Sequence, residues 1–244
     1  MNGSLPDSPL KGKNVLISGG STGIGRATAR WLAARGARVF IFGRDRQAVD
    51  DAVADIPANA CGSVGDQSKL EDVRRLFAEA EEKLGTIDIL INNAAVGSDE
   101  LLSGTDEEAS YIVNANVVGY LWCTRLALPA MLKRGRGHIV NVGSMSAEKK
   151  EGSEIYTATK AAIRGFSDAL RRSIGEKKVR VTLIEPGKTG TDLLEISTEE
   201  QEEKEARQEM LTAEEVAECI GFCLSVPERV SIARLQVVPL AHQS

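Results

Sequence analysis

The sequence contains few of the residues that bind transition metals or form disulfide frameworks. Its 244 residues include four cysteines and two histidines. The cysteines are scattered, and neither His138 nor His242 has a second potential ligand at a useful spacing. Cys219 and Cys223 share one expected helix, where we interpret them as small buried apolar residues. The sequence therefore predicts neither a metal site nor a disulfide framework.

Long apolar runs and an excess of positive charge are also lacking. The most apolar stretch, 120–132, is interrupted by Arg125 and Pro129 and is too short to span a bilayer. The segment 1–10 has neither the basic nor the apolar region of a signal peptide. Lysine and arginine total 30 against 35 aspartate and glutamate residues, whereas a nucleic-acid-binding protein presents a dense basic face. We expect a cytoplasmic protein that binds neither membranes nor nucleic acid.

The sequence does contain a regular alternation of short apolar runs and helical patterns. The expected strands, apolar on both faces, cover 14–18, 38–42, 88–91, 138–142, 179–184 and 235–238. The first expected helix follows the first strand and ends at Arg35, and the other expected helices cover 46–54, 68–84, 106–133, 155–175 and 213–225. Such strands, alternating with helices, form a parallel sheet covered on both faces. We predict an α/β fold, a single-domain doubly wound parallel sheet (Rossmann-like) of about seven strands with helices on both faces, over 11–244 after a flexible tail at 1–10.

The segment 198–209, TEEQEEKEARQE, is strongly charged and has almost no apolar residue. One interpretation is a helix with solvent around it. The other is a substrate lid over 191–212, because this segment lies between a strand end and the next helix, where open α/β sheets bind their ligands. The two interpretations are compatible.

A glycine-rich turn joins the first expected strand to the first expected helix. It reads SGGSTGIG from Ser18 to Gly25, with glycines at 19, 23 and 25. Glycines permit a tight turn and let backbone N–H groups approach a pyrophosphate at the positive end of the helix. In this place the turn predicts a dinucleotide-binding site.

The end of the second expected strand indicates which dinucleotide binds. NAD sites usually present an Asp or Glu there to the ribose 2′-OH, whereas a nearby Arg accommodates the 2′-phosphate of NADP. Gly43 stands at the acidic position, Arg44 follows it, and Asp45 is interpreted as a cap of the next helix. We interpret this as an NADP(H) site. In the alternative, Arg44 only caps a loop and NAD(H) binds.

Tyr156 and Lys160 lie four residues apart on an expected helix, a spacing that puts them on one face, about 5–6 Å apart at Cβ. A nearby cation favours the phenolate, so the pair suits a tyrosine that exchanges protons near neutral pH. Ser144 follows the strand at 138–142, at the edge of the sheet where ligands bind. The three side chains predict proton-transfer chemistry at that edge.

Over residues 10–243 the sequence resembles the short-chain dehydrogenase/reductase family. The motifs that carry the resemblance are the turn Ser18–Gly25, Asn92-Asn-Ala-Ala95, Asn116 in N-V-V-G, Ser144, Tyr156 with Lys160, and Pro186-Gly-Lys-Thr-Gly-Thr191. They stand in the order of the family, with family-like spacing.

The resemblance implies a role for each catalytic position. Tyr156 is expected to be the general acid that protonates a carbonyl oxygen, or the base in the reverse direction. Ser144 is expected to hydrogen-bond that oxygen. Lys160 is expected to bind the nicotinamide ribose and, with the nicotinamide's own charge, to lower the pKa of Tyr156. Asn116 is expected to hold a water in a proton relay that ends at Lys160.

The resemblance also implies where the cofactor is bound. The glycine-rich turn would hold the pyrophosphate, Asn92 and Ala94 would line the adenosine ribose, and the segment 186–191 would surround the carboxamide. The complete set of expected cofactor-binding residues is Gly19, Ser21, Thr22, Gly23, Ile24, Gly25, Arg44, Ser63, Val64, Asn92, Ala94, Tyr156, Lys160, Pro186, Gly187, Thr189 and Thr191.

Several positions depart from the family pattern. Ser18 replaces a threonine but keeps the hydroxyl, Ala95 stands where the family has a glycine, and Ser63 replaces an aspartate that contacts the adenine. The interval from Ser144 to Tyr156 is also shorter than the commonest family spacing. None of these departures removes a reacting group.

We predict an NADP(H)-dependent oxidoreductase that interconverts a carbonyl and an alcohol by hydride transfer. The alternatives are an NAD(H)-dependent dehydrogenase of the same family and a non-catalytic dinucleotide-binding sensor, which commonly lacks the tyrosine or the lysine. The residues expected around a partly apolar small-molecule substrate include Val96, Leu101, Leu102, Met145, Leu193 and Leu194. Apolar stripes on more than one face of the helices at 106–133 and 155–175 predict a homodimer or homotetramer.

Overall fold

The computed structural model describes residues 8–56, 60–150, 152–191 and 196–241, so most of the tail expected at 1–10 lies outside the described residues. One parallel sheet runs through the described part of the chain, in the order β3-β2-β1-β4-β5-β6-β7. The strands are β1 (Asn14–Ser18), β2 (Arg38–Gly43), β3 (Ala60–Val64), β4 (Ile89–Asn92), β5 (Gly137–Val142), β6 (Val179–Pro186) and β7 (Arg234–Val237). The predicted doubly wound α/β sheet is confirmed. Its strand order reverses between β1 and β4, where such sheets bind ligands.

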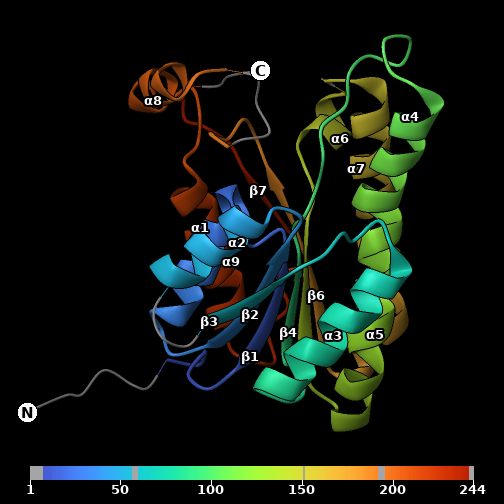
Figure 1. Ribbon diagram of the computed structural model, residues 1–244. Helices are drawn as coiled ribbons and strands as arrows, with labels where there is room; N and C mark the ends of the chain where they lie inside the picture. The colour runs from blue at the N-terminus through green and yellow to red at the C-terminus, as the bar shows by residue number, and fades with distance from the viewer. Residues whose placement is uncertain (1–7, 57–59, 151, 192–195, 242–244) are drawn as a thin grey trace, which may run out of the picture.

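Helices cover both faces of the sheet (Figure 1). The helices α1 (Gly23–Ala33), α2 (Arg46–Asp55) and α9 (Ala213–Ser225) lie on one face, and α3 (Leu70–Leu84), α5 (Gly119–Arg134) and α7 (Glu154–Ile174) lie on the other. Successive strand side chains point to opposite faces, so Val15 and Ile17 enter one core while Leu16 enters the other. This two-sided burial is the reason why the central strands carry apolar residues at successive positions instead of alternating apolar and polar ones.

The helix expected over 106–133 is divided. Helix α4 (Asp106–Val113) runs into a π-helical turn at Asn114–Val118, and α5 follows without a loop. A π turn bonds each N–H to the carbonyl five residues earlier, and Gly119 N donates to Asn114 O in this way. Because the chain stays helical throughout, apolar periodicity does not reveal this division.

Two short helices follow the carboxyl ends of β5 and β6, and one 3₁₀ turn precedes β6. They are α6 (Ser146–Lys149), a short 3₁₀ turn (Gly175–Lys177) and α8 (Thr198–Ala206). Helix α8 confirms the expected helix in the charged segment, and it buries none of its residues. Strand β3, at the edge of the sheet, is only half-buried, so its sequence ACGSV lacks the apolar run that marked the other strands.

Candidate active site

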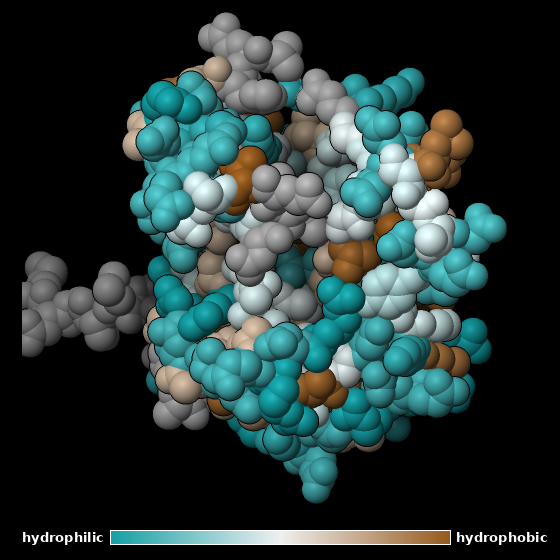
Figure 2. Space-filling view, turned by 45° about the horizontal axis from the view of Figure 1, so that its top comes forward, coloured by the Kyte–Doolittle hydropathy of each residue, from teal (hydrophilic) through white to brown (hydrophobic). Residues whose placement is uncertain are grey.

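The carboxyl ends of the strands bring most of the expected site residues to one edge of the sheet. Figure 2 is turned toward this edge and shows a hollow near its centre between mostly hydrophilic flanks. The glycine-rich turn lies after β1, Arg44 after β2, Ser144 after β5 and the segment 187–191 after β6. Tyr156 and Lys160 reach the same edge from α7.

The glycine-rich turn has the shape that a diphosphate requires. Gly19 and Gly23 have φ values of 61° and 48°, a region that favours glycine. A Cβ at Gly25 would lie 2.0 Å from the carbonyl oxygen of Gly19, so a side chain cannot be placed there. Helix α1 begins directly after Thr22, whose side chain makes no capping hydrogen bond. The turn therefore presents an uncapped, positive helix end, and the residues present fit a dinucleotide.

The loop after β4 holds this turn in place. The Ser18 hydroxyl accepts hydrogen bonds from the backbone N–H groups of Asn93 and Ala94, each over 3.0 Å. The Asn93 side chain donates back to the carbonyls of Ser18, at 3.1 Å, and Gly19, at 2.9 Å. The hydroxyl that Ser18 shares with the family's threonine is thus the group that the turn uses. Sequence reasoning missed Asn93, although it stands within the quoted N-N-A-A motif.

The side chain of Asn92 is directed into the sheet. Asn92 is fully buried, and its Nδ2 donates to Asn141 Oδ1 at 2.8 Å and to Thr124 Oγ1 at 3.1 Å. These bonds link β4 to β5 and α5. The Asn92 side chain therefore braces the sheet, and the expected position of this residue beside the adenosine ribose stays a prediction.

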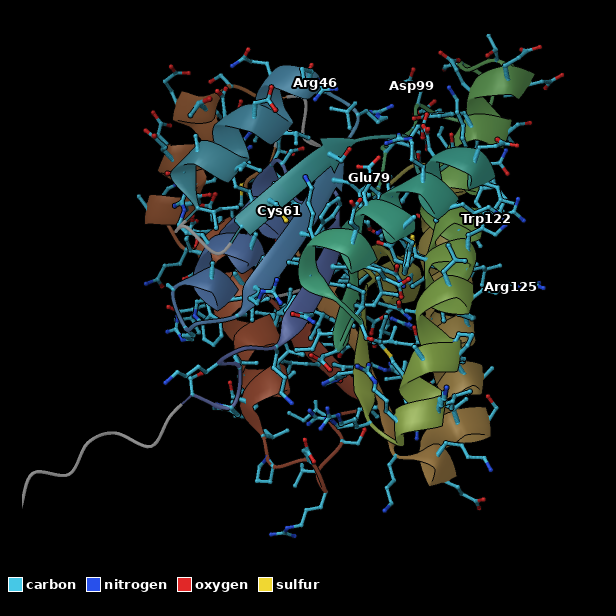
Figure 3. The ribbon with its side chains drawn as sticks, turned by 60° about the horizontal axis from the view of Figure 1, so that its bottom comes forward. Arg46, Cys61, Glu79, Asp99, Trp122 and Arg125 are labelled. Atoms are coloured by element: carbon cyan, nitrogen blue, oxygen red, sulfur yellow. The ribbon has the colours of Figure 1, made fainter. Side chains whose placement is uncertain are left out.

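The side of the edge where we expect the adenosine lies after β2 and β3. A Cβ at Gly43 would lie 2.4 Å from Ser21 Oγ, so the space of an acidic side chain is taken by the hydroxyl of the glycine-rich turn. Arg44 is exposed and donates to the phenol of Tyr111 on α4. The Ser63 side chain hydrogen-bonds Glu79, which lowers the pKa of that carboxyl. Glu79 lies on α3 and is labelled in Figure 3. Ser63 is thus engaged on the α3 face of the sheet.

Ser144, Tyr156 and Lys160 form one group beside β5. Burial raises the pKa of Tyr156 above its usual value of 10.0, and a hydrogen bond with the Ser144 side chain lowers it in part. Lys160 is 2% exposed, its Nζ donates to the carbonyl of Val142 at 3.1 Å, and it lies 5.5 Å from the centre of the Tyr156 ring. Burial lowers the pKa of Lys160 to about 8.

Desolvation is the largest influence on the pKa of both Tyr156 and Lys160, because it disfavours the charged form of each group. Tyr156 is consequently held as the protonated phenol at neutral pH. The expected lowering of the Tyr156 pKa by Lys160 and a nicotinamide charge together stays a prediction.

Asn116 lies in the π-helical turn and is fully buried. Its Oδ1 accepts from Val96 N and its Nδ2 donates to Val96 O, both at 2.8 Å. The same Nδ2 lies 3.3 Å from Thr159 Oγ1, next to Lys160. The side chain is therefore committed to the loop after β4, and the relay water expected at Asn116 stays a prediction.

The segment after β6 completes the edge. Met145 N donates to Pro186 O at 2.9 Å, which ties the chain beyond Ser144 to the end of β6. The Thr189 hydroxyl donates to Gly187 O at 3.0 Å. A Cβ at Gly23 would lie 3.1 Å from Thr191 Cγ2, so this segment reaches the glycine-rich turn. The turn and the segment 187–191 together border a single site.

An ion network with one buried carboxylate links the elements around the catalytic group. Glu185, fully buried at the end of β6, accepts from Arg164 Nε at 2.6 Å. Arg164 also donates to Glu148 of α6 at 3.2 Å, and Gln236 of β7 donates to the same carboxylate at 2.6 Å. The network joins α6, which follows Ser144, to α7 and β7.

No group of three or more His, Cys, Asp or Glu side chains in the described part of the chain could hold a metal ion. None of the helices in the same residues combines the length and apolarity that crossing a membrane requires.

A doubly wound sheet with a glycine-rich turn after β1 and a Ser–Tyr–Lys group beside β5 defines a class of proteins, the nicotinamide-dinucleotide oxidoreductases. Residues 13–202 match the short chain dehydrogenase family, and the chain belongs to that family. It is an NAD(P)-dependent oxidoreductase that acts on alcohol and carbonyl groups.

Named relatives span most of the chain. A 3-oxoacyl-[acyl-carrier-protein] reductase of Bos taurus is 37% identical over 77% of this chain and 80% of its own length. An NADP-dependent 3-hydroxy acid dehydrogenase of Schizosaccharomyces pombe is 31% identical over 97% of this chain and 95% of its own. The crystal structure of a 3-ketoacyl-(acyl-carrier-protein) reductase from Brucella melitensis, complexed with NADH, superposes with a TM-score of 0.84 at 29% identity, covering 93% of this chain and 97% of its own.

Proposed function

We propose that this chain is an NADP(H)-dependent oxidoreductase that interconverts a carbonyl and an alcohol, with Tyr156 as the general acid and base. The observation that carries the proposal is the buried group in which Tyr156 hydrogen-bonds Ser144 while the Lys160 Nζ lies 5.5 Å from the Tyr156 ring. Burial raises the pKa of the phenol, and a protonated phenol is the form that donates a proton to a carbonyl oxygen.

Each side chain of the group has a distinct task. The bound nicotinamide supplies or takes up the hydride. Ser144 Oγ hydrogen-bonds the substrate oxygen, and Tyr156 Oη gives its proton to that oxygen in reduction and takes it back in oxidation. The charge on Lys160 stabilises the phenolate that remains after the transfer. Asn116 is a positioning residue that fixes the loop at Val96.

The preference for NADP(H) rests on the end of β2. Gly43 offers no carboxylate to a ribose 2′-OH, and Arg44 is a cation at the place where a 2′-phosphate binds in related folds. The name of the yeast relative, NADP-dependent 3-hydroxy acid dehydrogenase, agrees with this preference. NAD(H) is the alternative cofactor, because the similar bacterial structure is complexed with NADH. Titrations with NADPH and NADH distinguish the two cofactors.

The substrate is proposed to be a small carbonyl or alcohol with an apolar chain. Leu101 and Leu102 are 55% and 97% exposed in the loop after β4, and Leu101 N donates to Glu154 at the start of the catalytic helix α7. Residues 193 and 194, also expected here, lie outside the described residues. We place α8 beside this pocket as part of the lid expected over 191–212, because Gln201 Nε2 lies 3.5 Å from Thr191 O.

The test of the catalytic assignment is the variant Tyr156→Phe. A panel of 3-oxo esters, 3-oxoacyl thioesters and aryl ketones is screened with NADPH by the loss of nicotinamide absorbance. With an active substrate, Tyr156→Phe should lower kcat by about 10²–10⁴-fold, since proton transfer contributes that much, while NADPH fluorescence titration gives an unchanged Kd. Full activity in the variant would defeat the assignment. Ser173→Ala, which removes an exposed hydroxyl from the same helix, serves as the matched control.

The same chain is proposed to form a homodimer or homotetramer through α4, α5 and α7. Val113 and Leu121 are 42% and 37% exposed along α4 and α5, although both are apolar. Helix α7 presents small exposed residues such as Ala162 and Gly165, and a Cβ at Gly165 meets nothing within 4 Å. Small residues let two helices approach closely. Light scattering should give a multiple of the 26.2 kDa chain mass that falls in the variant Gly165→Arg, and a monomeric mass for the wild type would contradict this.

A further inference from the structure

Three side chains from different elements meet at the adenosine side of the edge. Strands β2 and β3 pair with Gly43 opposite Val64, so Arg44 and Asp66 emerge at the same edge of the sheet. Tyr111 reaches this place from α4, which follows β4 in the chain. Arg44 donates a guanidinium N–H to the Tyr111 oxygen over 2.5 Å, and the Tyr111 hydroxyl donates to Asp66 Oδ2 at 3.3 Å.

Asp66 gives this chain of contacts a fixed end. Its Oδ1 accepts from Ser68 N, and its own N–H donates to Asp72 Oδ2, both at 2.9 Å, so the carboxylate is held within the turn that starts α3. Burial raises the pKa of Tyr111, so the phenol keeps its proton and donates it to that carboxylate. The hydroxyl oxygen is thereby left to accept the N–H of Arg44.

Arg44 gains orientation from this contact. The side chain is exposed and sits in a loop, and a free arginine carries about 2 kcal/mol of rotamer entropy. A bond to Tyr111 uses one of its five N–H donors and leaves the others for an anion. The Tyr111 ring centre lies 5.6 Å from Arg44 Cζ, which further restricts the guanidinium. Pre-orientation of this kind strengthens binding because less freedom is lost when the ligand arrives.

We infer that Tyr111 is a positioning residue for cofactor specificity: its hydroxyl, anchored by Asp66, holds Arg44 in the orientation that binds a phosphate on the 2′-oxygen of an adenosine ribose. The inference rests on the NADP(H) preference proposed above and adds the residue that makes Arg44 selective. Tyr111 acts through Arg44 and does not itself contact the phosphate.

The test compares Tyr111→Phe, Arg44→Ala and the double variant. Each variant is titrated separately with four ligands: NADPH, NADH, adenosine 2′,5′-bisphosphate and AMP. Binding of the bisphosphate and of AMP is measured by calorimetry, because these two ligands carry no nicotinamide. Tyr111→Phe keeps the ring and removes the hydroxyl, so it should weaken NADPH and the bisphosphate by about fivefold to tenfold, with NADH and AMP unchanged within twofold. Ser110→Ala, which removes an exposed hydroxyl from the same helix, is the matched control and should change none of the four.

The remaining variants separate the inference from the proposed function. Arg44→Ala should weaken NADPH more than tenfold, and adding Tyr111→Phe to it should change nothing further, since the two residues act as one unit. Unchanged or tighter NADPH binding in Tyr111→Phe, beside a clear loss in Arg44→Ala, overturns the inference and leaves the NADP(H) preference standing. An unchanged NADPH-to-NADH ratio in Arg44→Ala overturns both. Urea unfolding of every variant shows that the compared proteins are folded.

Discussion

His138 is a neutral histidine buried in the middle of the sheet, and this makes a prediction about stability and pH. It is 2% exposed on β5, and burial, aided by the nearby charge of Arg180, lowers its pKa from 6.5 to about 3. Its Nε2 lies 2.8 Å from Thr182 Oγ1, whose own proton goes to Ile232 O at 2.7 Å. The Nε2 is therefore the protonated nitrogen. The Nδ1 is buried without a hydrogen-bond partner, which leaves no acceptor for a second proton.

The magnitude follows from proton linkage. Between pH 6.5 and about pH 3 the unfolded chain binds a proton at His138 that the folded chain refuses, so stability falls as the pH falls. The slope reaches about 1.4 kcal/mol per pH unit, and from pH 7.5 to pH 5 the integrated loss is about 2 kcal/mol. At pH 5 this loss scarcely depends on the exact folded pKa, because any value well below 5 leaves the folded histidine neutral.

The variant His138→Gln isolates this loss, because glutamine can donate to Thr182 but does not titrate. Urea unfolding of both proteins at several pH values should show that the wild type loses about 2 kcal/mol more than the variant between pH 7.5 and pH 5. Other acidic groups contribute equally to both proteins and cancel in the difference. Parallel pH profiles would refute the reasoning, as would a His138 proton resonance that titrates near pH 6.5 in the folded protein. A His242→Gln variant assigns the second histidine resonance.

Substitutions at three further positions have specific expected outcomes. A Cβ at Gly221 of α9 would lie 2.3 Å from the Trp31 ring of α1, so Gly221→Ala should destabilise the fold by about 1–3 kcal/mol in urea, and an unchanged midpoint would contradict the packing. Lys160→Met should stabilise the protein at pH 7 by on the order of 3 kcal/mol while abolishing turnover. The pKa of Lys160 is lowered to about 8, so the cost of burying its charge is complete below pH 8 and is relieved as the pH rises toward 10.5. A variant less stable than the wild type at pH 7 would contradict this expectation. Ser18→Ala leaves two backbone N–H groups without their acceptor and should cost about 2–4 kcal/mol, whereas Ser18→Thr should be nearly neutral; equal losses in both variants would show that the hydroxyl is not the cause.

The sheet was predictable because it is buried on both faces. Strands β1, β2, β4, β5 and β6 contain apolar residues at successive positions, which a single sequence displays directly. Strand β3 is half-buried at the sheet edge, and its sequence ACGSV was not among the expected strands. The glycine-rich turn was also predictable, because its glycines stand where the backbone has a positive φ, at Gly19 and Gly23.

The direction in which a side chain points was harder to predict. Asn92 and Asn93 are neighbours, but only Asn93 reaches the glycine-rich turn, because adjacent strand residues face opposite ways. The pKa of Tyr156 depends on how far other segments of the chain bury it. The four-residue spacing between Tyr156 and Lys160 gives no information about that burial. Tyr111 meets Arg44 across 67 residues and belongs to no motif, so only the structure reveals that contact.

We propose above all that this edge of the sheet binds NADP(H) in preference to NAD(H). One pair of titrations tests this proposal and requires no known substrate. The purified wild-type protein is titrated with NADPH and, separately, with NADH, and nicotinamide fluorescence reports binding. We predict that NADPH binds at least tenfold more tightly, because Arg44 meets a phosphate that NADH lacks. Comparable or tighter binding of NADH would contradict the account and would show that Arg44 does not contact the cofactor.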